Sequence, residues 1–229
     1  MPRQVDHESR RRIVAEAVCA LADERGLEGV TLRDVAARAE VSMGAVQRCF
    51  RTKEEMLLFA LTHVGDRITE RVRTRLVAGP AQSARTALGH ATAEVALLRE
   101  EHRAEARVWL AFVAQAVVSE PLARALRADY ADLEGAFTRL VAEACGPGGE
   151  EPATGAAAAA GPTGDGASPA DPAGDGASPA DPRTTARTLL ALADGLTAHV
   201  LIGHLTPRQA QDVLHTHLAA LWERPPAAR

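Results

Sequence analysis

The chain has 229 residues, of which 46% are hydrophobic and 3% aromatic, so it is long enough to bury a core and is not disordered throughout. Its apolar residues are mostly Ala, Leu and Val, which favour helices over sheets, and the composition therefore predicts an all-α fold. The net charge of −4 excludes a polycation, and Cys19, Cys49 and Cys145 match no metal spacing, so neither a disulfide nor a metal site is expected.

Four helices are predicted in the first 80 residues. The first covers roughly residues 8–25, the second and third lie within 31–50, and the fourth continues to Gly79. Capping residues mark these boundaries: Gly26 after the first helix, Thr31 with Asp34 at the second, Ser42 at the third, and Thr52 with Glu55 at the fourth. Three more helices are predicted after Pro80, over roughly residues 82–100, 102–118 and 120–145.

The composition changes abruptly after these helices. Residues 146–182 are nearly all Gly, Pro, Ala, Asp and Ser, and GDGASPADP occurs at 164–172 and again at 174–182. Because such a segment has no apolar face to bury, it predicts a flexible acidic linker. Two helices, at about 183–204 and 207–223, close the chain. The first of them is apolar on almost all sides, which predicts burial, partly against a second copy of itself.

Residues 31–50, TLRDVAARAEVSMGAVQRCF, have the layout of a helix-turn-helix. Ala36 is small where the two helices would cross, and Val41 would fill the turn between them. Val46 and Phe50 would anchor the second helix in the core. A short helix that is packed on one side and polar or slender on the other can enter the major groove of DNA.

The outer face of that second helix carries Met43, Gly44, Gln47 and Arg48. Gln47 can pair with adenine, Arg48 can reach a guanine or a phosphate, and Gly44 would allow the backbone to approach DNA closely. Residues 31–53 contain five basic and two acidic side chains, a local charge of +3 that suits phosphate contacts. Glu40 lies in the turn, where a left-handed backbone conformation costing about 1 kcal/mol is expected.

In order and spacing, residues 10–62 resemble the TetR family of regulators. The resemblance rests on the first helix ending in Gly26, on VTLRDVAARAEVSMGAVQRCF, and on RTKEEMLLFAL. It implies nine helices, a helix-turn-helix domain at residues 1–51, and a ligand-binding and dimerisation domain at 52–229 that the linker interrupts. The VQ-x-x-F pattern is similar to the choline-pathway-repressor subgroup. Gln47 and Cys49 depart from the aromatic residues common in the family at these positions.

The resemblance also implies which residues meet DNA. Ser42, Thr31 and Lys53 would hold phosphates, and Lys53 would do so at the start of the fourth helix, where the helix dipole favours an anion. The complete set of predicted DNA contacts is Thr31, Arg33, Ser42, Met43, Gly44, Gln47, Arg48 and Lys53. The run Arg10–Arg12 either reaches DNA as an arm or only solvates the first helix.

A small-molecule pocket is expected among the middle helices, by the same resemblance. Its candidate residues are His102, Glu105, Trp109, Phe112, Tyr130, Phe137 and His199. Core packing alone would also produce the broad helical face that carries the first four of these, and His199 is equally explained as a core or interface residue. The two histidines His215 and His217 diverge on a helix and form no metal pair.

The sequence therefore predicts a homodimeric repressor, joined through its last two helices, that a small molecule releases from palindromic double-stranded DNA. An activator or a ligand-independent regulator is the alternative. A helical enzyme is a remote one, because the sequence has no phosphate loop, nucleophile elbow or metal-ligand cluster, and no cofactor is expected. No apolar run reaches the roughly 18 residues of a membrane span, so we expect a soluble, cytoplasmic protein without a membrane partner.

Overall fold

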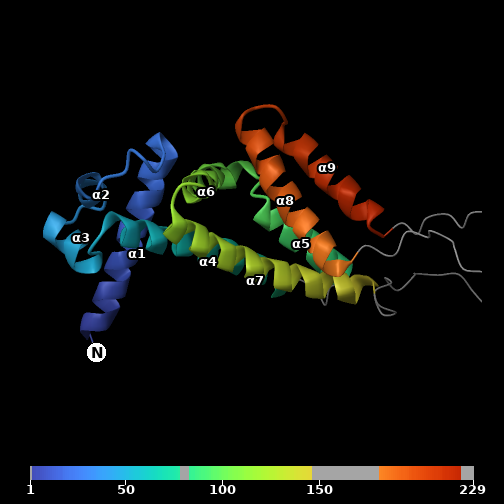
Figure 1. The fold of residues 1–229 in the computed structure, drawn as a ribbon, viewed down its shortest axis with the longest axis horizontal. Helices are drawn as coiled ribbons and strands as arrows, with labels where there is room; N and C mark the ends of the chain where they lie inside the picture. Colours follow the sequence, from blue (N-terminus) through green and yellow to red (C-terminus); the bar gives the residue numbers. More distant parts are fainter. Residues whose placement is uncertain (1, 78–82, 146–180, 223–229) are drawn as a thin grey trace, which may run out of the picture.

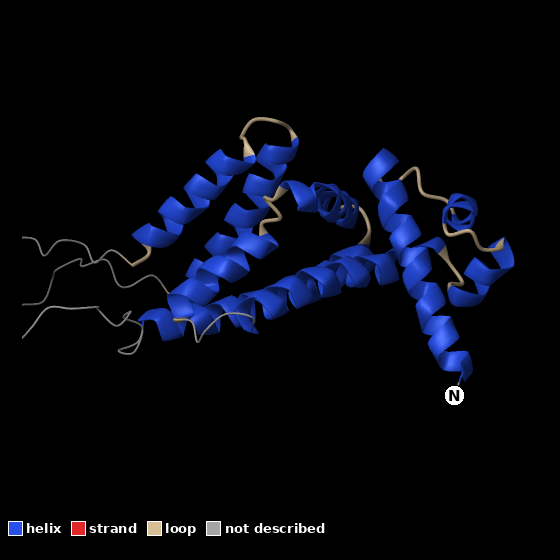
Figure 2. Cartoon of the chain, turned by 180° about the vertical axis from the view of Figure 1, so that it is seen from behind, coloured by secondary structure: helices blue, strands red, loops and turns tan. Residues whose placement is uncertain are grey.

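The computed structural model describes residues 2–77, 83–145 and 181–222, which form helices and no strand (Figure 2). The α-helices in this part of the chain are α1 (Pro2–Arg25), α2 (Leu32–Arg38), α3 (Met43–Cys49), α4 (Lys53–Val77), α5 (Ala84–Val95), α6 (Arg103–Ala116), α7 (Glu120–Cys145), α8 (Pro182–Leu201) and α9 (Pro207–Ala220), with a 3-10 turn, η1 (Glu100–His102), before α6. None of these helices is both long and apolar enough to cross a membrane. The predicted all-α fold is confirmed.

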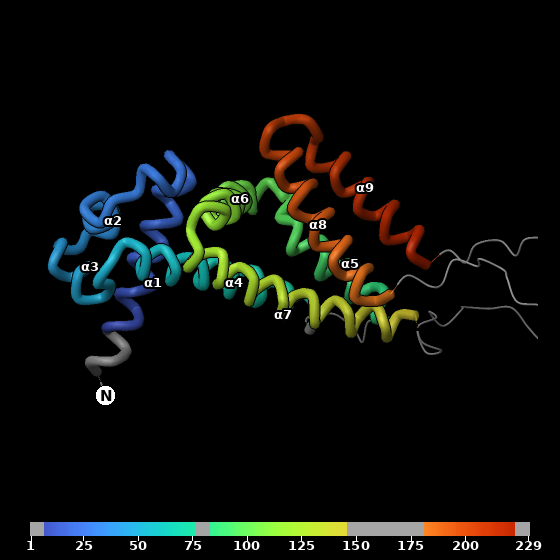
Figure 3. The backbone as a smooth tube through the Cα atoms, in the orientation of Figure 1, coloured from blue at the N-terminus to red at the C-terminus, as the bar shows by residue number. Residues whose placement is uncertain are grey.

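The molecule is elongated, with α1, α2 and α3 gathered at one end and the α8–α9 hairpin toward the other (Figure 1). From the N-terminal end α4 runs into the body of the molecule, where it packs against α5 and α7. Helices α7 and α8 pack against each other, and α9 lies against α8 and α5 (Figure 3). α4 is therefore the helix that connects the two ends.

Side-chain caps fix the two short helices α2 and α3. The amide of Asp34 donates to Thr31 Oγ1 at 3.2 Å, and the amide of Ala45 donates to Ser42 Oγ at 3.2 Å. Between the helices Glu40 has a φ of +54°, which confirms the left-handed turn predicted from the sequence. Caps of this kind stabilise a helix by about 1 kcal/mol each, so the start of α3 is set by local chemistry.

Two hydrophobic clusters hold the helices together. The first joins α1, α2 and α3 to the first half of α4 and to α6, and it contains the fully buried rings of Phe50 and Phe112. The second joins α5, α7, α8 and α9, with Phe137 and Leu189 among its buried side chains. The first cluster includes residues on both sides of position 51, where the helix-turn-helix domain is predicted to end. The N-terminal helices therefore pack on both α4 and α6.

Arg11 of α1 contributes to this packing. Its guanidinium lies 4.8 Å from the ring centre of Phe50 and 4.3 Å from that of Phe59, and the two rings are 5.5 Å apart. Arg11 Nη2 also lies 4.0 Å from a carboxylate oxygen of Glu55. A guanidinium over two rings is attracted by their faces, so Arg11 contributes to the packing of α1 on α4.

Two predicted helix ends are wrong, and backbone geometry explains both. The helix expected over 82–100 ends at Val95, because Leu97 has a φ of +49° that no α-helix allows, and the chain turns through η1 into α6. The helix expected to reach residue 204 ends at Leu201, and Gly203 follows with a φ of +76°, the usual conformation after a helix C-cap.

The predicted linker lies outside the described residues except for its last two members, Asp181 and Pro182. These two belong to α8: the amide of Thr184 donates to the Asp181 carboxylate at 3.0 Å, and Pro182 occupies the first turn. The start of α8 is also held to α7 by the ion pairs Arg183–Glu134 and Arg187–Glu134. The repeat therefore ends where a capped and docked helix begins.

The three cysteines are free and lie in different surroundings. Cys49 is buried on the inner face of α3, and Cys145 is exposed at the last residue of α7. Burial raises the pKa of the Cys19 thiol on α1 to about 12. The three thiols thus differ strongly in access to solvent.

Candidate functional site

Helix α3 turns one face to the core and the other to solvent. Ala45, Val46 and Cys49 are buried on the inner face. The outward side chains are those that the sequence singled out: Gln47 and Arg48 are exposed and Met43 is 39% exposed. The helix is capped by Ser42 at one end and ends at the buried Phe50 at the other. It is therefore short, rigidly held, and free along a polar face, as a helix that enters a major groove must be.

Gly44 lies on this outer face without a structural need for glycine. A Cβ atom built at Gly44 would come no closer than 3.6 Å to any neighbour, and that neighbour is the flexible Arg48 guanidinium. Its φ lies outside the left-handed region. Because glycine inside a helix costs about 1 kcal/mol relative to alanine, its presence here points to a partner that approaches the backbone.

The basic side chains around α3 differ in whether they already form hydrogen bonds or ion pairs within the protein. Arg38 donates to Glu24 at 2.7 Å, and this bond lowers the pKa of Glu24. Lys53, at the first residue of α4, donates a long hydrogen bond of 3.4 Å to the carbonyl oxygen of Glu28. Arg33 and Arg48 are exposed and form no ion pair within the described residues. Arg51, just after α3, is exposed in the same way. The charge available to a partner therefore comes from these three arginines and from Lys53.

The three predicted phosphate contacts each lie at the start of a helix, Thr31 before α2, Ser42 before α3 and Lys53 in α4, and these helices are grouped at one end of the molecule (Figure 3). The Thr31 hydroxyl already donates to Asp34 at 2.7 Å, and this bond lowers the pKa of Asp34. To donate to a phosphate, the Thr31 hydroxyl would have to give up its hydrogen bond to Asp34. Ser42 is exposed and accepts only its capping bond.

A cavity of about 360 Å³ lies between α4 and α7, with one residue each from α5 and α6 in its wall. Its apolar part is formed by Ile68, Val95, Trp109, Leu133 and Ala136. Its charged part is formed by Asp66, Asp129 and Asp132. None of these three carboxylates forms an ion pair in the part of the chain that the structure describes. Burial and the two neighbouring carboxylates raise the pKa of Asp129.

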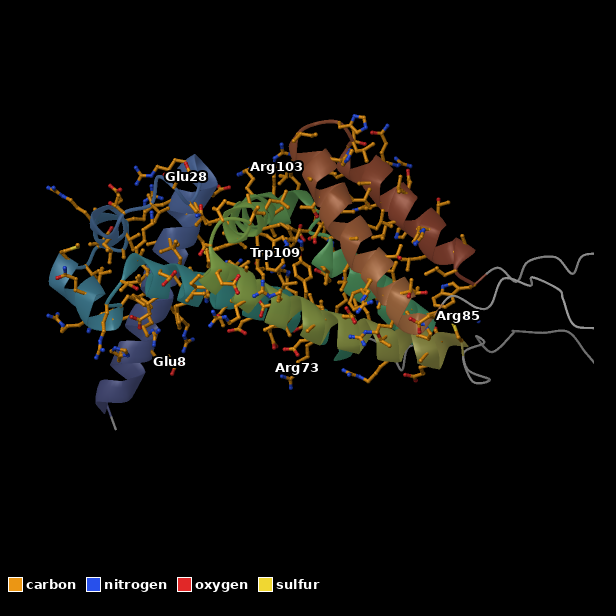
Figure 4. All side chains as sticks on the ribbon, in the orientation of Figure 1. Glu8, Glu28, Arg73, Arg85, Arg103 and Trp109 are labelled. Carbon is orange, nitrogen blue, oxygen red and sulfur yellow. The ribbon has the colours of Figure 1, made fainter. Side chains whose placement is uncertain are left out.

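The wall beside Trp109 is held by a half-buried carboxylate, that of Asp194. The indole of Trp109 (α6) donates to Asp194 (α8) at 3.2 Å, and the hydroxyl of Tyr130 (α7) donates to the other oxygen of Asp194 at 2.5 Å. The two rings meet edge to face with centres 5.9 Å apart. Figure 4 shows Trp109 in the middle of the molecule, close to α6 and α7. The cavity wall is thereby tied to α8.

Family comparisons agree with this geometry. A family model described as bacterial regulatory proteins of the tetR family matches residues 14–59, and a second, described as the C-terminal region of BetI-type transcriptional repressors, matches residues 81–161 and 168–223. The chain belongs to the TetR family of transcriptional regulators. The first match covers the helix-turn-helix, and the second covers α5 to α9, which include α7 on one side of the cavity.

Characterised TetR relatives align with part of the chain. The transcriptional regulator PksA of Bacillus subtilis is 37% identical over 118 residues, which cover 51% of this chain and 56% of PksA. The transcriptional regulator BetI of Burkholderia thailandensis is 33% identical over 147 residues, which cover 62% of this chain and 71% of BetI. The chain thus spans little more than half of PksA. These relatives are regulators, and the hypothesis of a helical enzyme is set aside.

Solved structures of TetR-type regulators share the fold over nearly the whole chain. A transcriptional regulator from Rhodococcus sp. RHA1 superposes with a TM-score of 0.71 at 26% identity, covering 92% of this chain and 95% of that one. A regulator from Saccharomonospora viridis, solved in complex with choline, gives a TM-score of 0.70 at 20% identity, covering 93% of this chain and 96% of that one. The second likeness concerns the fold alone.

Of the seven predicted pocket residues of this TetR protein, Trp109 lines the cavity and Tyr130 supports its wall. Phe112 and Phe137 are 0% and 2% exposed and fill the two hydrophobic cores. The other three lie elsewhere: His102 and Glu105 are buried beside arginines of α4, and His199 is exposed with its ring 4.9 Å from that of His204. The structure does not bring these seven residues together.

Sequence reasoning missed the four carboxylates in and behind the cavity. Asp66, Asp129 and Asp132 come from α4 and α7, and their meeting depends on how those helices cross. Asp194 did carry a local signal, because it is the only charged residue in the apolar stretch LLALADGLTAHVL of α8. A lone carboxylate in such a stretch must be hydrogen-bonded when it is buried, and Trp109 and Tyr130 are its donors.

We expect Tyr130→Phe to lower the free energy of unfolding by about 1.5–3 kcal/mol at pH 7, because it removes a hydrogen bond to the half-buried carboxylate of Asp194. Burial raises the pKa of Asp194, so the folded protein holds a proton on this carboxyl more tightly than the unfolded chain does. The free energy of unfolding therefore decreases as the pH rises from the ordinary pKa of an aspartate to the raised one. The loss in Tyr130→Phe should therefore be smaller at pH 4 than at pH 7. Urea unfolding at the two pH values measures it, and an equal loss at both would contradict the assignment.

Proposed function

We propose that this TetR protein is a homodimeric regulator that binds operator DNA in the cytoplasm through α3 and leaves it when a small molecule occupies the cavity. The observation that carries the proposal is the outer face of α3, whose exposed Gln47 and Arg48 project from a helix buried on its other side. In this proposal these two side chains read base edges, while Ser42 and Lys53 approach phosphates.

The outer side of the α8–α9 hairpin supports dimerisation. Its exposed residues include a set of small or apolar ones: Ala191, Gly195, Ile202, Val213, Thr216 and Ala220. Ile202 and Val213 are 77% and 43% exposed. Small side chains let two such faces approach closely, and a two-fold axis there would present both copies of α3 to one side of a duplex. The two helices would then need to lie about 34–36 Å apart to enter successive major grooves.

The cavity supports an effector that is a small organic cation. Asp66, Asp129 and Asp132 place three carboxylates on it without an arginine or lysine partner in the described residues, and Trp109 supplies an aromatic wall. An alkylammonium group is attracted both by carboxylates and by the face of an indole ring. A structural relative was solved in complex with choline, a cation of this kind, which makes choline a suitable first probe.

DNA selection tests the first part of the proposal. The purified protein should select duplexes from a random-sequence pool, and the enriched sequences should be palindromic with half-sites about one helical turn apart. Lys53→Ala should weaken binding to all selected sequences and reduce the salt slope, while Gln47→Ala should change base preference. If no sequence is enriched, or if binding shows no salt dependence, the proposal is wrong.

Gly44→Ala should stabilise the protein and weaken its hold on DNA. The added methyl group meets nothing closer than 3.6 Å and removes a helix-interior glycine, so the free energy of unfolding should rise by up to about 1 kcal/mol. If the backbone of α3 approaches DNA at Gly44, the same methyl group should reduce affinity for the selected duplex by roughly tenfold. Thermal unfolding and fluorescence anisotropy give the two values. Unchanged affinity would show that DNA does not approach this position.

Calorimetric titration with choline tests the effector. Asp129→Asn should weaken choline binding by roughly fivefold or more, because it removes the most buried of the three charges. Glu143→Gln, which changes an exposed carboxylate on the same helix outside the cavity, is the matched control. If choline and other alkylammonium ions fail to bind, or bind Asp129→Asn as well as the wild type, the cavity does not take a cation. That result would not contradict the proposal that the protein binds DNA.

An activator or a regulator without an effector remains the alternative. It shares the DNA contacts but not the release from DNA. Adding choline to a preformed complex with the selected duplex separates the readings, because release favours the proposed mechanism, while binding of choline without release favours the alternative.

A further inference from the structure

Two carboxylates that do not line the acidic cavity are buried beside α4. Glu94 near the end of α5 is 4% exposed and Glu105 in the first turn of α6 is 9% exposed, and they are the buried charged residues of the part that the structure describes. Both face the same side chain, Arg71 of α4. One guanidinium thus joins three helices.

The guanidinium of Arg71 is divided between the two acids. Its Nη2 lies 2.8 Å from Glu105 Oε2, and its Nε lies 3.7 Å from Glu94 Oε2. Both nitrogens are shielded from solvent, and neither makes a hydrogen bond of good geometry. Nε and Nη2 form the edge of the guanidinium whose two parallel N–H groups match the two oxygens of one carboxylate. The edge that suits one acid is therefore shared by two.

Through this edge two closer pairings are possible, and they exclude each other because only one carboxylate at a time can take both Nε and Nη2. The edge can grip Glu105, which ties α4 to α6, or Glu94, which ties α4 to α5. Each acid also has a second arginine, since Arg67 Nε lies 3.7 Å from Glu105 and Arg99 Nη2 lies 3.4 Å from Glu94. Whichever acid loses Arg71 keeps a positive neighbour. The exchange thus leaves no buried charge alone, which would cost several kcal/mol.

Each member of the cluster is directly connected to the cavity wall. Glu94 precedes Val95, Trp109 lies one helical turn after Glu105, and Arg71 lies one turn after Ile68. A ligand that moves Val95 or Trp109 relative to α4 changes the distance from Arg71 to the corresponding acid. α4 begins beside α3, so a shift of α4 reaches the DNA-binding end.

We propose that Arg71 is a positioning residue with two alternative partners: its guanidinium pairs with Glu105 in one arrangement of the protein and with Glu94 in the other, and the choice sets the position of α4. The effect on DNA rests on the proposed function, whereas the exchange of partners does not. Ligand occupancy and DNA binding are coupled because each favours one of the two pairings.

Matched carboxamide variants test the exchange. Glu94→Gln leaves Glu105 as the only charged partner and Glu105→Gln leaves Glu94, so their affinities for the DNA duplex selected by the wild type should change in opposite directions, by roughly threefold or more each. Glu101→Gln, which removes an exposed acid 3.4 Å from Arg99, is the control and should match the wild type. Changes in the same direction, or none in folded variants, would overturn the proposal.

Hydrogen exchange supplies a readout that needs no DNA. In Glu94→Gln the backbone amides at the start of α6 should exchange more slowly than in the wild type, and in Glu105→Gln those at the end of α5 should do so, because the remaining acid gains the whole guanidinium edge. A purely structural ion pair would give faster exchange in both variants, which would contradict the proposal.

Arg71→Lys separates the paired geometry from charge. It keeps the positive charge but has no two-pronged edge, so the opposite effects of the two carboxamide changes should disappear in this background. If they persist, the edge of Arg71 is not the switching element. If one carboxamide variant fails to fold, the other decides alone: slower exchange at the helix that carries its remaining acid is expected, and faster exchange there would overturn the proposal. If the protein selects no duplex, the proposed function is wrong. The hydrogen-exchange measurements still test the exchange of partners at Arg71 in that case.

Discussion

Gly195→Arg is expected to leave the protomer folded and to remove most of its affinity for operator DNA. Gly195 is exposed in the middle of α8, and a Cβ atom there would meet nothing within 4 Å. The change also replaces a helix-interior glycine with a better helix former. In a symmetric dimer built on this face, however, each arginine would meet its own copy or the facing helix, and two desolvated like charges would force the protomers apart.

Loss of the dimer removes the advantage of binding two half-sites at once. Affinity for the palindromic duplex should fall by about 100-fold or more, since linking two modules gains factors of that order. Analytical ultracentrifugation should give a monomer, and circular dichroism should be unchanged. Gly195→Ala, which adds only a methyl group at the same place, should remain dimeric and bind normally. If Gly195→Arg stays a dimer, the protomers meet on another face.

Phe50→Ala should lower the free energy of unfolding by about 3–5 kcal/mol and loosen α3 from its seat. The Phe50 side chain is 1% exposed at the end of α3, where it packs on Phe59 under the guanidinium of Arg11. Removing the ring leaves a cavity under the helix that carries Gln47 and Arg48. Because a helix that enters the major groove must be held rigidly, DNA affinity should fall further than the loss of folded protein explains.

A second phenylalanine provides the control for that comparison. Phe137 is 2% exposed in the other hydrophobic cluster, between α7 and its neighbours, so Phe137→Ala should be destabilised by a similar amount. Its remaining folded fraction should bind DNA normally. Urea unfolding and anisotropy at a temperature where both variants are folded make the test. Equal effects of the two substitutions on DNA binding would mean that Phe50 acts only through global stability.

The DNA-binding end of the fold was readable from the sequence because its signals act over three or four residues. The caps at Thr31 and Ser42, the left-handed Glu40 and the buried Phe50 all lie where the pattern predicts them. Each depends on one side chain and the backbone next to it. The predicted DNA contacts remain predictions, although the structure places Gln47 and Arg48 on an exposed face.

The cavity was not readable, because it depends on how helices far apart in sequence cross. The large rings were expected to line it, yet Phe112 and Phe137 fill the cores, since a large apolar ring gains most from complete burial. The acids that line the cavity, Asp66, Asp129 and Asp132, look like ordinary surface residues of their own helices. The position of Glu105 on a helix face predicts that it lines the pocket. In the structure Glu105 instead pairs with Arg71 of α4.

The three thiols give the wild-type chain a built-in attachment point for a fluorescent dye. Cys49 is closed off in the core, and the raised pKa of Cys19 leaves almost none of it as the nucleophilic thiolate near neutral pH. Maleimide should therefore react first at Cys145, which is exposed at the end of α7, away from the N-terminal helices. A single label could be installed there without removing any cysteine, and it would report on the motion of α7 without touching the DNA-facing surface.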